Sequence, residues 1–195
     1  MSERVHDLAQ GVFTVSGIFT PEECRDLIAY GEGLGFEAAA VTTTAGPKMM
    51  PDLRNNDRAM FDDPVFAESV WERVRSFVPA EIDGRAAVSL GERFRFYRYD
   101  PGQRFNAHRD GVVTLESGAR SYLSFLIYLN TEYSGGETTF LDYLLPSGDK
   151  SEAPLRVRPE EAGMGLFFRH RLLHEGAEVT AGRKYVLRTD VFYGG

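Results

Sequence analysis

The chain has 195 residues, of which 43% are hydrophobic and 26% charged, and its formal net charge is -7. This length and balance fit one globular domain with a core of its own. The acidic charge argues against nucleic acid as a general partner, and the single cysteine, Cys24, excludes a disulfide framework and a thiolate metal site. No apolar stretch approaches the roughly 18 residues of a membrane span, and the first ten residues lack a secretory pattern. We therefore expect a cytoplasmic protein without a membrane partner.

Two amphipathic helices are expected in the first 80 residues. A capping-box pattern begins at Thr20 and predicts a helix over 20–33. A second helix is expected to begin near 62–64 and to end before Pro79. The segment between them, 42–58, is either a solvated connection or a lid over a site, and the sequence leaves both interpretations open.

From about residue 88 onward, the pattern changes to short strands separated by glycine-rich turns. Period-two alternation predicts a strand over 93–99, and apolar runs predict strands over 121–130, 165–168 and 184–193. The polar segment 142–162 contains three prolines and is an excursion between strands, either over the active-site mouth or on the surface. Many short strands with such turns indicate a barrel or a jelly roll.

An H-x-D motif carries the chemistry. His108 and Asp110 lie two residues apart in a segment expected to be extended, so both side chains point to one face and reach one ion. Two imidazoles and one carboxylate suit a divalent first-row metal with open coordination positions. We prefer His174, 64 residues after Asp110, as the third ligand, although His170 competes for this role. The remaining histidine, His6, is expected to be solvated.

Two cationic residues follow on the strand expected over 184–193. Lys184, Val186 and Arg188 share one face of this strand because side chains alternate with a period of two. A cation buried beside a metal site is costly unless it has an anionic partner. A dicarboxylate that bridges the metal and the cation would be such a partner.

The chain resembles the prolyl 4-hydroxylase-type branch of the Fe(II)/2-oxoglutarate-dependent dioxygenases. The segments that carry the resemblance are YDPGQRFNAHRDG (99–111), SFLIYLN (124–130), GGETTF (135–140), and GMGLFF and LHEGAEVTAGRKYVLRTDVFY within 163–193. The resemblance implies a mainly β fold with flanking helices, a double-stranded β-helix of the jelly-roll, cupin-like kind. It implies one domain over 1–195, with a helical front at about 18–80 and a β-helix core at about 88–193.

The resemblance also implies that His108, Asp110 and His174 bind Fe(II). The cosubstrates would be 2-oxoglutarate and O₂, with ascorbate as an optional reductant. The implied reaction couples oxidative decarboxylation of 2-oxoglutarate to hydroxylation of an unactivated C–H bond. Relatives that halogenate have a small residue in place of the metal-binding carboxylate, so Asp110 favours hydroxylation over chlorination.

The cosubstrate pocket is implied in the same way. Lys184 stands where this branch has the basic residue that pairs with the distal carboxylate of 2-oxoglutarate. Arg188 either shares that carboxylate or holds the substrate, and the sequence does not rank the two. Tyr99 and Tyr128 match tyrosines that line this pocket, with buried core aromatics as the alternative.

The substrate is the least determined part of the sequence-based hypothesis. It is an amino-acid-like, peptidyl or small molecule, and the candidate substrate residues are Arg54, Asn56, Arg58 and Arg95, each with a surface role as the alternative. The competing function is a jelly-roll metal-binding enzyme or sensor that does not use 2-oxoglutarate, although such sites usually draw on more histidines than the four present. The sequence does not reveal the oligomeric state.

Overall fold

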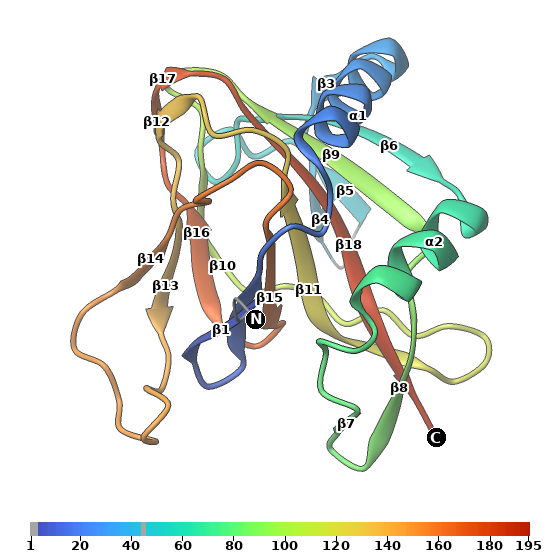
Figure 1. Ribbon diagram of the computed structural model, residues 1–195. Coiled ribbons are helices and arrows are strands. Elements are labelled where there is room, and N and C mark those ends of the chain that lie inside the picture. The colour runs from blue at the N-terminus through green and yellow to red at the C-terminus, as the bar shows by residue number, and fades with distance from the viewer. Residues whose placement is uncertain (1–3, 44–45) are drawn as a thin grey trace.

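The computed structural model describes residues 4–43 and 46–195, and these form two facing β-sheets with helices on the outside (Figure 1). In spatial order, the larger sheet contains β1 (Val5–Ala9), β2 (Val12–Val15), β15 (Gly165–Arg169), β11 (Arg120–Tyr128), β18 (Lys184–Gly194), β9 (Arg93–Tyr99), β6 (Asp57–Asp62) and β3 (Glu37–Ala38). Two further strands, β8 (Arg85–Leu90) and β7 (Glu81–Ile82), extend it from β18.

The smaller sheet covers one face of the larger one. Its order is β10 (Phe105–His108), β16 (Leu173–Gly176), β13 (Thr138–Asp142) and β14 (Leu155–Val157). Two further two-stranded sheets are present: β12 (Tyr133–Gly135) pairs with β17 (Val179–Gly182), and β4 (Val41–Thr43) pairs with β5 (Gly46–Lys48). The expected mainly β fold with flanking helices is confirmed, and the strands expected over 93–99, 121–130, 165–168 and 184–193 correspond to β9, β11, β15 and β18.

Strand alternation divides the core into two layers. Phe94 and Phe96 of β9 belong to the hydrophobic cluster that includes the helices, whereas Tyr97 and Tyr99 belong to the cluster between the two sheets. The same period of two places Leu187 of β18 in the outer cluster. The inner face of the larger sheet therefore carries the polar and aromatic residues that line the space between the sheets.

The two described helices pack on the outer face of the larger sheet (Figure 1). Helix α1 (Pro21–Leu34) has Thr20 as its N-cap, and a complete capping box confirms the predicted start. Cys24 is fully buried in this helix. Helix α2 (Pro64–Val74) has Asp63 as its N-cap and buries Trp71 in the outer cluster.

The capping box offers a direct test of this local account. Thr20→Ala removes the hydroxyl that accepts a hydrogen bond from the Glu23 backbone N–H at 3.2 Å, which leaves one helix donor without its cap. We expect the free energy of unfolding to fall by about 1 kcal/mol, measured by urea denaturation. Ser76→Ala, at an exposed position, is the control and should leave the midpoint unchanged.

Part of the chain that the sequence left as loop is in fact strand. Residues 57–62, the end of the expected loop and the start of the second expected helix, form β6 and pair with β9. The pattern DRAMFD does not alternate in polarity, so it does not predict a strand. In the structure, Asp57 is accommodated in the strand by an ion pair with Arg98 of β9 at 3.0 Å. The expected range of the helical front, 18–80, thus also contributes strands to the larger sheet. Positions 44–45 of the expected loop lie outside the described residues.

Candidate active site

Neighbouring strands of the smaller sheet bring together the three residues of the predicted metal site. His108 ends β10 and is the register partner of His174 on β16, so the two imidazoles lie side by side with ring centroids 4.3 Å apart. Asp110 follows two residues after His108, and its backbone N–H donates to the His170 carbonyl at 3.1 Å. This bond holds the chain turned so that the carboxylate faces both imidazoles.

The distances suit coordination of a single ion. The His108 Nε2 atom is 3.7 Å from Oδ1 of Asp110, and the His174 Nε2 atom is 3.7 Å from Oδ2 of the same carboxylate. All three ligand atoms lie within 4.8 Å of one another, and among the described residues this is the only group of three or more such side chains. His170 is not part of it.

Backbone carbonyls orient both imidazoles. The Nδ1 atom of His108 is 2.8 Å from the Asn106 carbonyl oxygen, and Nδ1 of His174 is 3.0 Å from the Leu172 carbonyl oxygen. A carbonyl only accepts, so each Nδ1 carries the proton and each Nε2 presents its lone pair to the shared centre. The His108 ring also stacks on the Phe105 ring, with ring centroids 3.6 Å apart, and this contact further fixes its orientation.

The electrostatics keep the imidazoles neutral and the carboxylate charged. Burial, followed by the neighbouring His174, lowers the pKa of His108 to about 4, and burial also lowers the pKa of His174. Burial raises the pKa of Asp110, but the positive charge of Arg188, together with the hydrogen bond from Ser124, outweighs this effect, so the pKa falls below its ordinary value. These are the protonation states in which such groups bind a metal.

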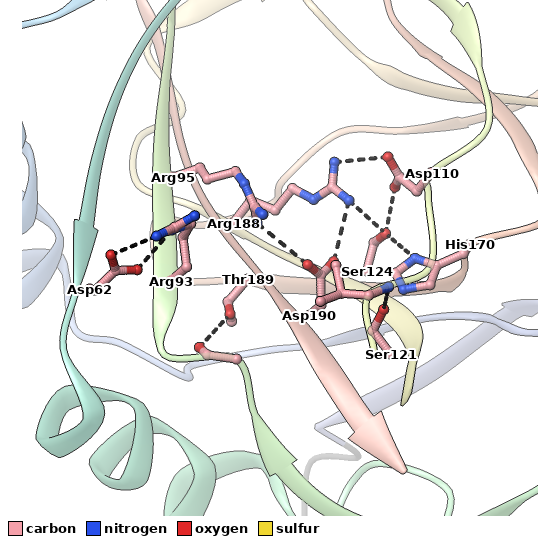
Figure 2. A network of polar contacts seen from close by, with 12 residues as sticks. Asp62, Arg93, Arg95, Asp110, Ser121, Ser124, His170, Arg188, Thr189 and Asp190 are labelled. Carbon is pink, nitrogen blue, oxygen red and sulfur yellow. Dashed lines mark hydrogen bonds and ion pairs between the residues drawn. The ribbon is translucent and has the colours of Figure 1, made fainter. Parts of the chain in front are cut away.

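Arg188 lies within a buried polar network on the inner face of the larger sheet (Figure 2). Its Nη1 donates to Asp110 Oδ1 at 2.8 Å, and its Nη2 is 3.3 Å from Asp190 Oδ1. Ser124 donates to the other oxygen of Asp110 at 2.5 Å and contacts Nδ1 of His170 at 2.9 Å. His170 thus reaches the candidate metal site through Ser124.

Lys184 lies in a separate, inner cavity beside the two histidines. Its side chain is 3% exposed, and this cavity is also lined by His108, His174 and Tyr99. Its Nζ donates to the Gly136 carbonyl oxygen at 2.6 Å, and no described acidic side chain lies within ion-pair distance of it. Burial lowers the pKa of Lys184 to about 7. A positive φ of 69° at Gly136, where a Cβ would lie 2.9 Å from a Val179 methyl carbon, helps to aim that carbonyl.

The model of the 2OG-Fe(II) oxygenase superfamily matches residues 94–189, a range that includes His108, Asp110, His174, Lys184 and Arg188. Residues 94–189 belong to the 2OG-Fe(II) oxygenase superfamily. The predicted family is thereby confirmed, and the cofactors of this superfamily are Fe(II), 2-oxoglutarate and O₂.

Curated relatives of this oxygenase carry prolyl 4-hydroxylase names. It is 24% identical to probable prolyl 4-hydroxylase 4 and 26% identical to prolyl 4-hydroxylase 1, both of Arabidopsis thaliana. Each match covers 89% of the chain, but only 64% and 66% of the respective relatives. The chain thus spans slightly less than two thirds of the length of these proteins.

Solved structures establish the fold of the oxygenase. The viral collagen prolyl hydroxylase of Paramecium Bursaria Chlorella virus-1, in its 2OG complex, is similar with a TM-score of 0.62 and 21% identity, over 93% of this chain and 95% of that one. A prolyl hydroxylase of Trichoplax adhaerens, in complex with a peptide fragment, is similar with a TM-score of 0.68 and 15% identity, over 93% and 83%. The predicted double-stranded β-helix is confirmed.

The two tyrosines predicted for the cosubstrate pocket both lie near Lys184. Its Nζ is 5.2 Å from the ring centre of Tyr99 and 5.5 Å from that of Tyr128. Tyr128 is fully buried and its hydroxyl is 2.7 Å from the Thr138 hydroxyl, which lines the inner cavity. No sequence pattern singles out Thr138, since its role depends on the register of β13 against the other strands.

A second, outer cavity of about 330 Å³ shares His108 and Arg188 with the inner cavity, and Asp110 also contributes to its wall. Three of the four predicted substrate residues, Arg54, Arg58 and Arg95, line it. The fourth, Asn56, is fully buried outside the cavity, where it accepts a hydrogen bond from Arg54 Nε at 2.7 Å.

Asp190 also lines the outer cavity, and sequence reasoning overlooked it. A signal was present, because Asp190 is two residues after Arg188 and therefore on the same strand face. Its carboxylate is 3.4 Å from Arg95 and 3.3 Å from Arg188, so it joins two arginines that are register partners on β9 and β18.

The two segments considered as lids differ in position. Ala40, Val41, Leu53 and Arg54 place the segment around 42–58 in the wall of the outer cavity. No residue of 142–162 lines either cavity, although Asp142 forms an ion pair with Arg109 at 3.5 Å.

Among the helices described, none has the length and apolar character needed to cross a membrane.

Proposed function

We propose that this oxygenase hydroxylates an unactivated C–H bond, with Fe(II) bound by His108, Asp110 and His174 and with 2-oxoglutarate as cosubstrate. The observation that carries the proposal is the position of Lys184, a buried ammonium with no carboxylate of the described residues in ion-pair distance, in a cavity that both imidazoles also line. A dicarboxylate between the metal and this cation would neutralise it. The family match supports this function over a jelly-roll enzyme or sensor that does not use 2-oxoglutarate.

The donor set fits Fe(II). Two neutral imidazoles and one carboxylate on one side of an ion leave positions free for further ligands, which is the ligand set typical of non-haem iron oxygenases. The imidazole nitrogens are oriented by backbone carbonyls, so little reorganisation is needed when the metal binds. Asp110 retains hydrogen bonds from Arg188 and Ser124, which hold its carboxylate in place.

Lys184 fits the distal carboxylate of 2-oxoglutarate better than Arg188 does. The ammonium has three N–H donors, and the structure supplies the Gly136 carbonyl oxygen for one of them. Arg188, in contrast, already faces the carboxylates of Asp110 and Asp190. We infer that Lys184 binds the cosubstrate, with Tyr99 and Tyr128 as aromatic walls, and that Arg188 positions Asp110.

When bound, Fe(II) would activate O₂ as the oxidant and 2-oxoglutarate would supply two electrons as it is converted to succinate and CO₂, so that one oxygen atom enters the substrate C–H bond to give an alcohol. The chain's own residues hold the reactants in place. Phe105 and Phe168 are among the inner-cavity residues that exclude water from the two histidines. The substrate would reach the site from the outer cavity, because His108 and Asp110 form part of its wall.

The substrate class is proposed as peptidyl or amino-acid-like. Curated relatives are named prolyl 4-hydroxylases, and one structural neighbour was solved with a peptide fragment. We also propose a cytoplasmic location, since the only cysteine is a free thiol, as is common in reducing compartments.

Anaerobic titration tests the function. The protein is loaded with Fe(II), and 2-oxoglutarate is added while the weak visible charge-transfer band of an Fe(II)–keto-acid chelate is monitored. We expect the band to appear for the wild type and to be absent for His174→Ala. His6→Ala, at an exposed histidine far along the chain from the triad, is the control and should keep the band. Iron binding without a band would contradict the use of 2-oxoglutarate.

A further inference from the structure

The outer cavity has an unusual charge for a protein with a net charge of -7. Arg54, Arg58 and Arg95 line it, together with Arg188, whereas its acidic side chains are Asp110 and Asp190. Both of these carboxylates are already engaged by Arg188. Among the described residues, no carboxylate therefore lies within ion-pair distance of Arg54 or Arg58, the arginines on the wall formed by β6 and the segment before it.

Arg54 is built into the cavity wall as a rigid donor. Its side chain is 4% exposed, and its guanidinium carbon lies 4.4 Å from the ring centres of both Tyr97 and Phe105. Asn56 accepts its Nε–H, but the buried Nη2 has no hydrogen-bond partner among the described residues. A buried charged donor left unpaired is costly, so such an arrangement indicates a ligand with an acceptor oxygen.

Arg58 extends this donor surface. It is half-buried on β6, with Tyr97 of β9 and Glu37 of β3 as its register partners, and its side chain forms no hydrogen bond or ion pair with the residues that the structure describes. Burial lowers the pKa of Arg58, and the positive charges of Arg54 and Arg95 lower it further, whereas Tyr97 and Glu37 oppose this shift. An anion bound between the guanidinium groups would offset their mutual repulsion.

The lowered pKa of Tyr97 indicates the same positive potential in the outer cavity. Burial by itself raises the pKa of a phenol, but the charges of Arg188, Arg54 and Arg95 outweigh it, and the pKa of Tyr97 falls below its ordinary value. Across the sheet, Arg95 and Arg188 are direct register partners, a like-charge pair that is unfavourable by itself. Asp190 bridges this pair (Figure 2) and leaves Arg54 and Arg58 as the unneutralised cations.

We propose that the substrate of this oxygenase carries a carboxylate, which binds Arg54 and Arg58 in the outer cavity while the C–H bond to be oxidised faces His108 and Asp110. This inference rests on the proposed function. A planar guanidinium matches a carboxylate through two parallel hydrogen bonds. The cavity volume of about 330 Å³ accommodates an amino-acid-sized group or the corresponding part of a peptide.

The carboxylate subsite is separate from the one proposed for 2-oxoglutarate. Lys184 lies in the inner cavity, and neither Arg54 nor Arg58 lines that cavity. A neutral substrate would leave the buried Arg54 unpaired, and sites of this kind discriminate strongly against analogues that lack the matching group. The carboxylate therefore sets specificity, and the relevant comparison is between an acid and its amide.

Calorimetric titration of anaerobic Fe(II)-loaded protein tests the inference with matched probes. The first pair is N-acetyl-L-proline and N-acetyl-L-proline amide, which differ only at the terminal carboxylate. The second pair is a proline-containing peptide with blocked ends and an internal glutamate, and the same peptide with glutamine. We expect the acid of at least one pair to bind about tenfold or more tightly than its amide. The pair that responds identifies a terminal or a side-chain carboxylate as the source.

Variants separate this subsite from the cosubstrate pocket. Arg58→Gln should weaken binding of the acid about tenfold, to the level of the amide, and should leave binding of 2-oxoglutarate unchanged. Lys184→Met should do the reverse. Arg93→Gln is the matched control, because Arg93 lies on β9 outside the outer cavity and pairs with Asp62 at 2.8 Å.

Three results would overturn the carboxylate subsite: equal binding of acid and amide in both pairs, no binding of any acid, or equal losses in Arg58→Gln and Arg93→Gln. Failure of the proposed function has a different signature, since 2-oxoglutarate would then bind neither the wild type nor Arg58→Gln. Arg54→Gln is a second variant, and its thermal unfolding must match that of the wild type before its binding is compared, because Arg54 packs between two rings.

Discussion

Replacing Lys184 with methionine should raise the dissociation constant of 2-oxoglutarate by about 30-fold or more. Loss of one partner of a buried charge pair costs about 2 kcal/mol or more, and each 1.4 kcal/mol is about a factor of ten in affinity. Methionine has a similar length and needs no counter-charge, so the free energy of unfolding should not fall. Isothermal titration and urea denaturation measure the two quantities.

Lys150→Met is the matched control for this variant. Lys150 is exposed and pairs with Asp142 at 3.3 Å, outside both cavities, so its loss should leave 2-oxoglutarate binding unchanged. Undiminished cosubstrate affinity in Lys184→Met would remove Lys184 from the pocket. In that case, Arg188 would become the remaining cation of the site.

The pH dependence gives the Lys184 prediction a sign. With a pKa of about 7 in the free folded protein, Lys184 loses its proton as pH rises above 7, so the affinity for the dicarboxylate should weaken with rising pH. In the unfolded chain the lysine pKa is near its ordinary value of 10.5, so between these values the unfolded state binds more protons. The contribution of Lys184 to the free energy of unfolding therefore becomes more favourable as pH rises between these two values, by up to about 1.4 kcal/mol per pH unit. Lys184→Met should lack this contribution.

Asp110→Ala should abolish substrate-dependent succinate formation and weaken Fe(II) binding. The variant removes one of the three proposed ligands and leaves Arg188 with Asp190 as its acidic partner. Removing one partner of a buried ion pair costs about 3–5 kcal/mol, so we also expect lower thermal stability. Unchanged turnover in Asp110→Ala would remove Asp110 from the metal site.

A double variant separates the structural effect from the loss of metal. Asp110→Ala combined with Arg188→Met removes both charges, so the unpaired guanidinium disappears and stability should partly recover. Fe(II) binding should remain weak, because the carboxylate is still absent. If metal binding recovered together with stability, Asp110 would have only a structural role.

Local patterns account for the elements that were predicted correctly. Helix α1 begins where the capping box of Thr20 places it, since the hydroxyl and the Glu23 carboxylate satisfy backbone donors within the same turn. Strand β9 spans Arg93–Tyr99 as the period-two pattern indicated, because one of its faces packs under the helices and the other between the sheets. Such signals lie within a few residues of one another and need no knowledge of the fold.

Long-range pairing accounts for what was missed. Strands β1 and β2 precede the first helix, and β2 joins β15 from the other end of the chain, so no nearby residue indicates that Val12–Val15 lies in the sheet. Strand β6 was not predicted, because its carboxylates Asp57 and Asp62 find their partners, Arg98 and Arg93, only on the distant strand β9. The sequence contains these charges but not their partners.

The sequence by itself determined the kind of fold, the metal-binding candidates His108, Asp110 and His174, and the face of β18 that carries Lys184 and Arg188. Only the tertiary structure decided which of these two cations has acidic partners: Arg188 faces Asp110 and Asp190, whereas Lys184 faces a backbone carbonyl. The physical reason is that the energy of a buried charge depends on the groups within a few ångströms, and the register between distant strands sets those groups.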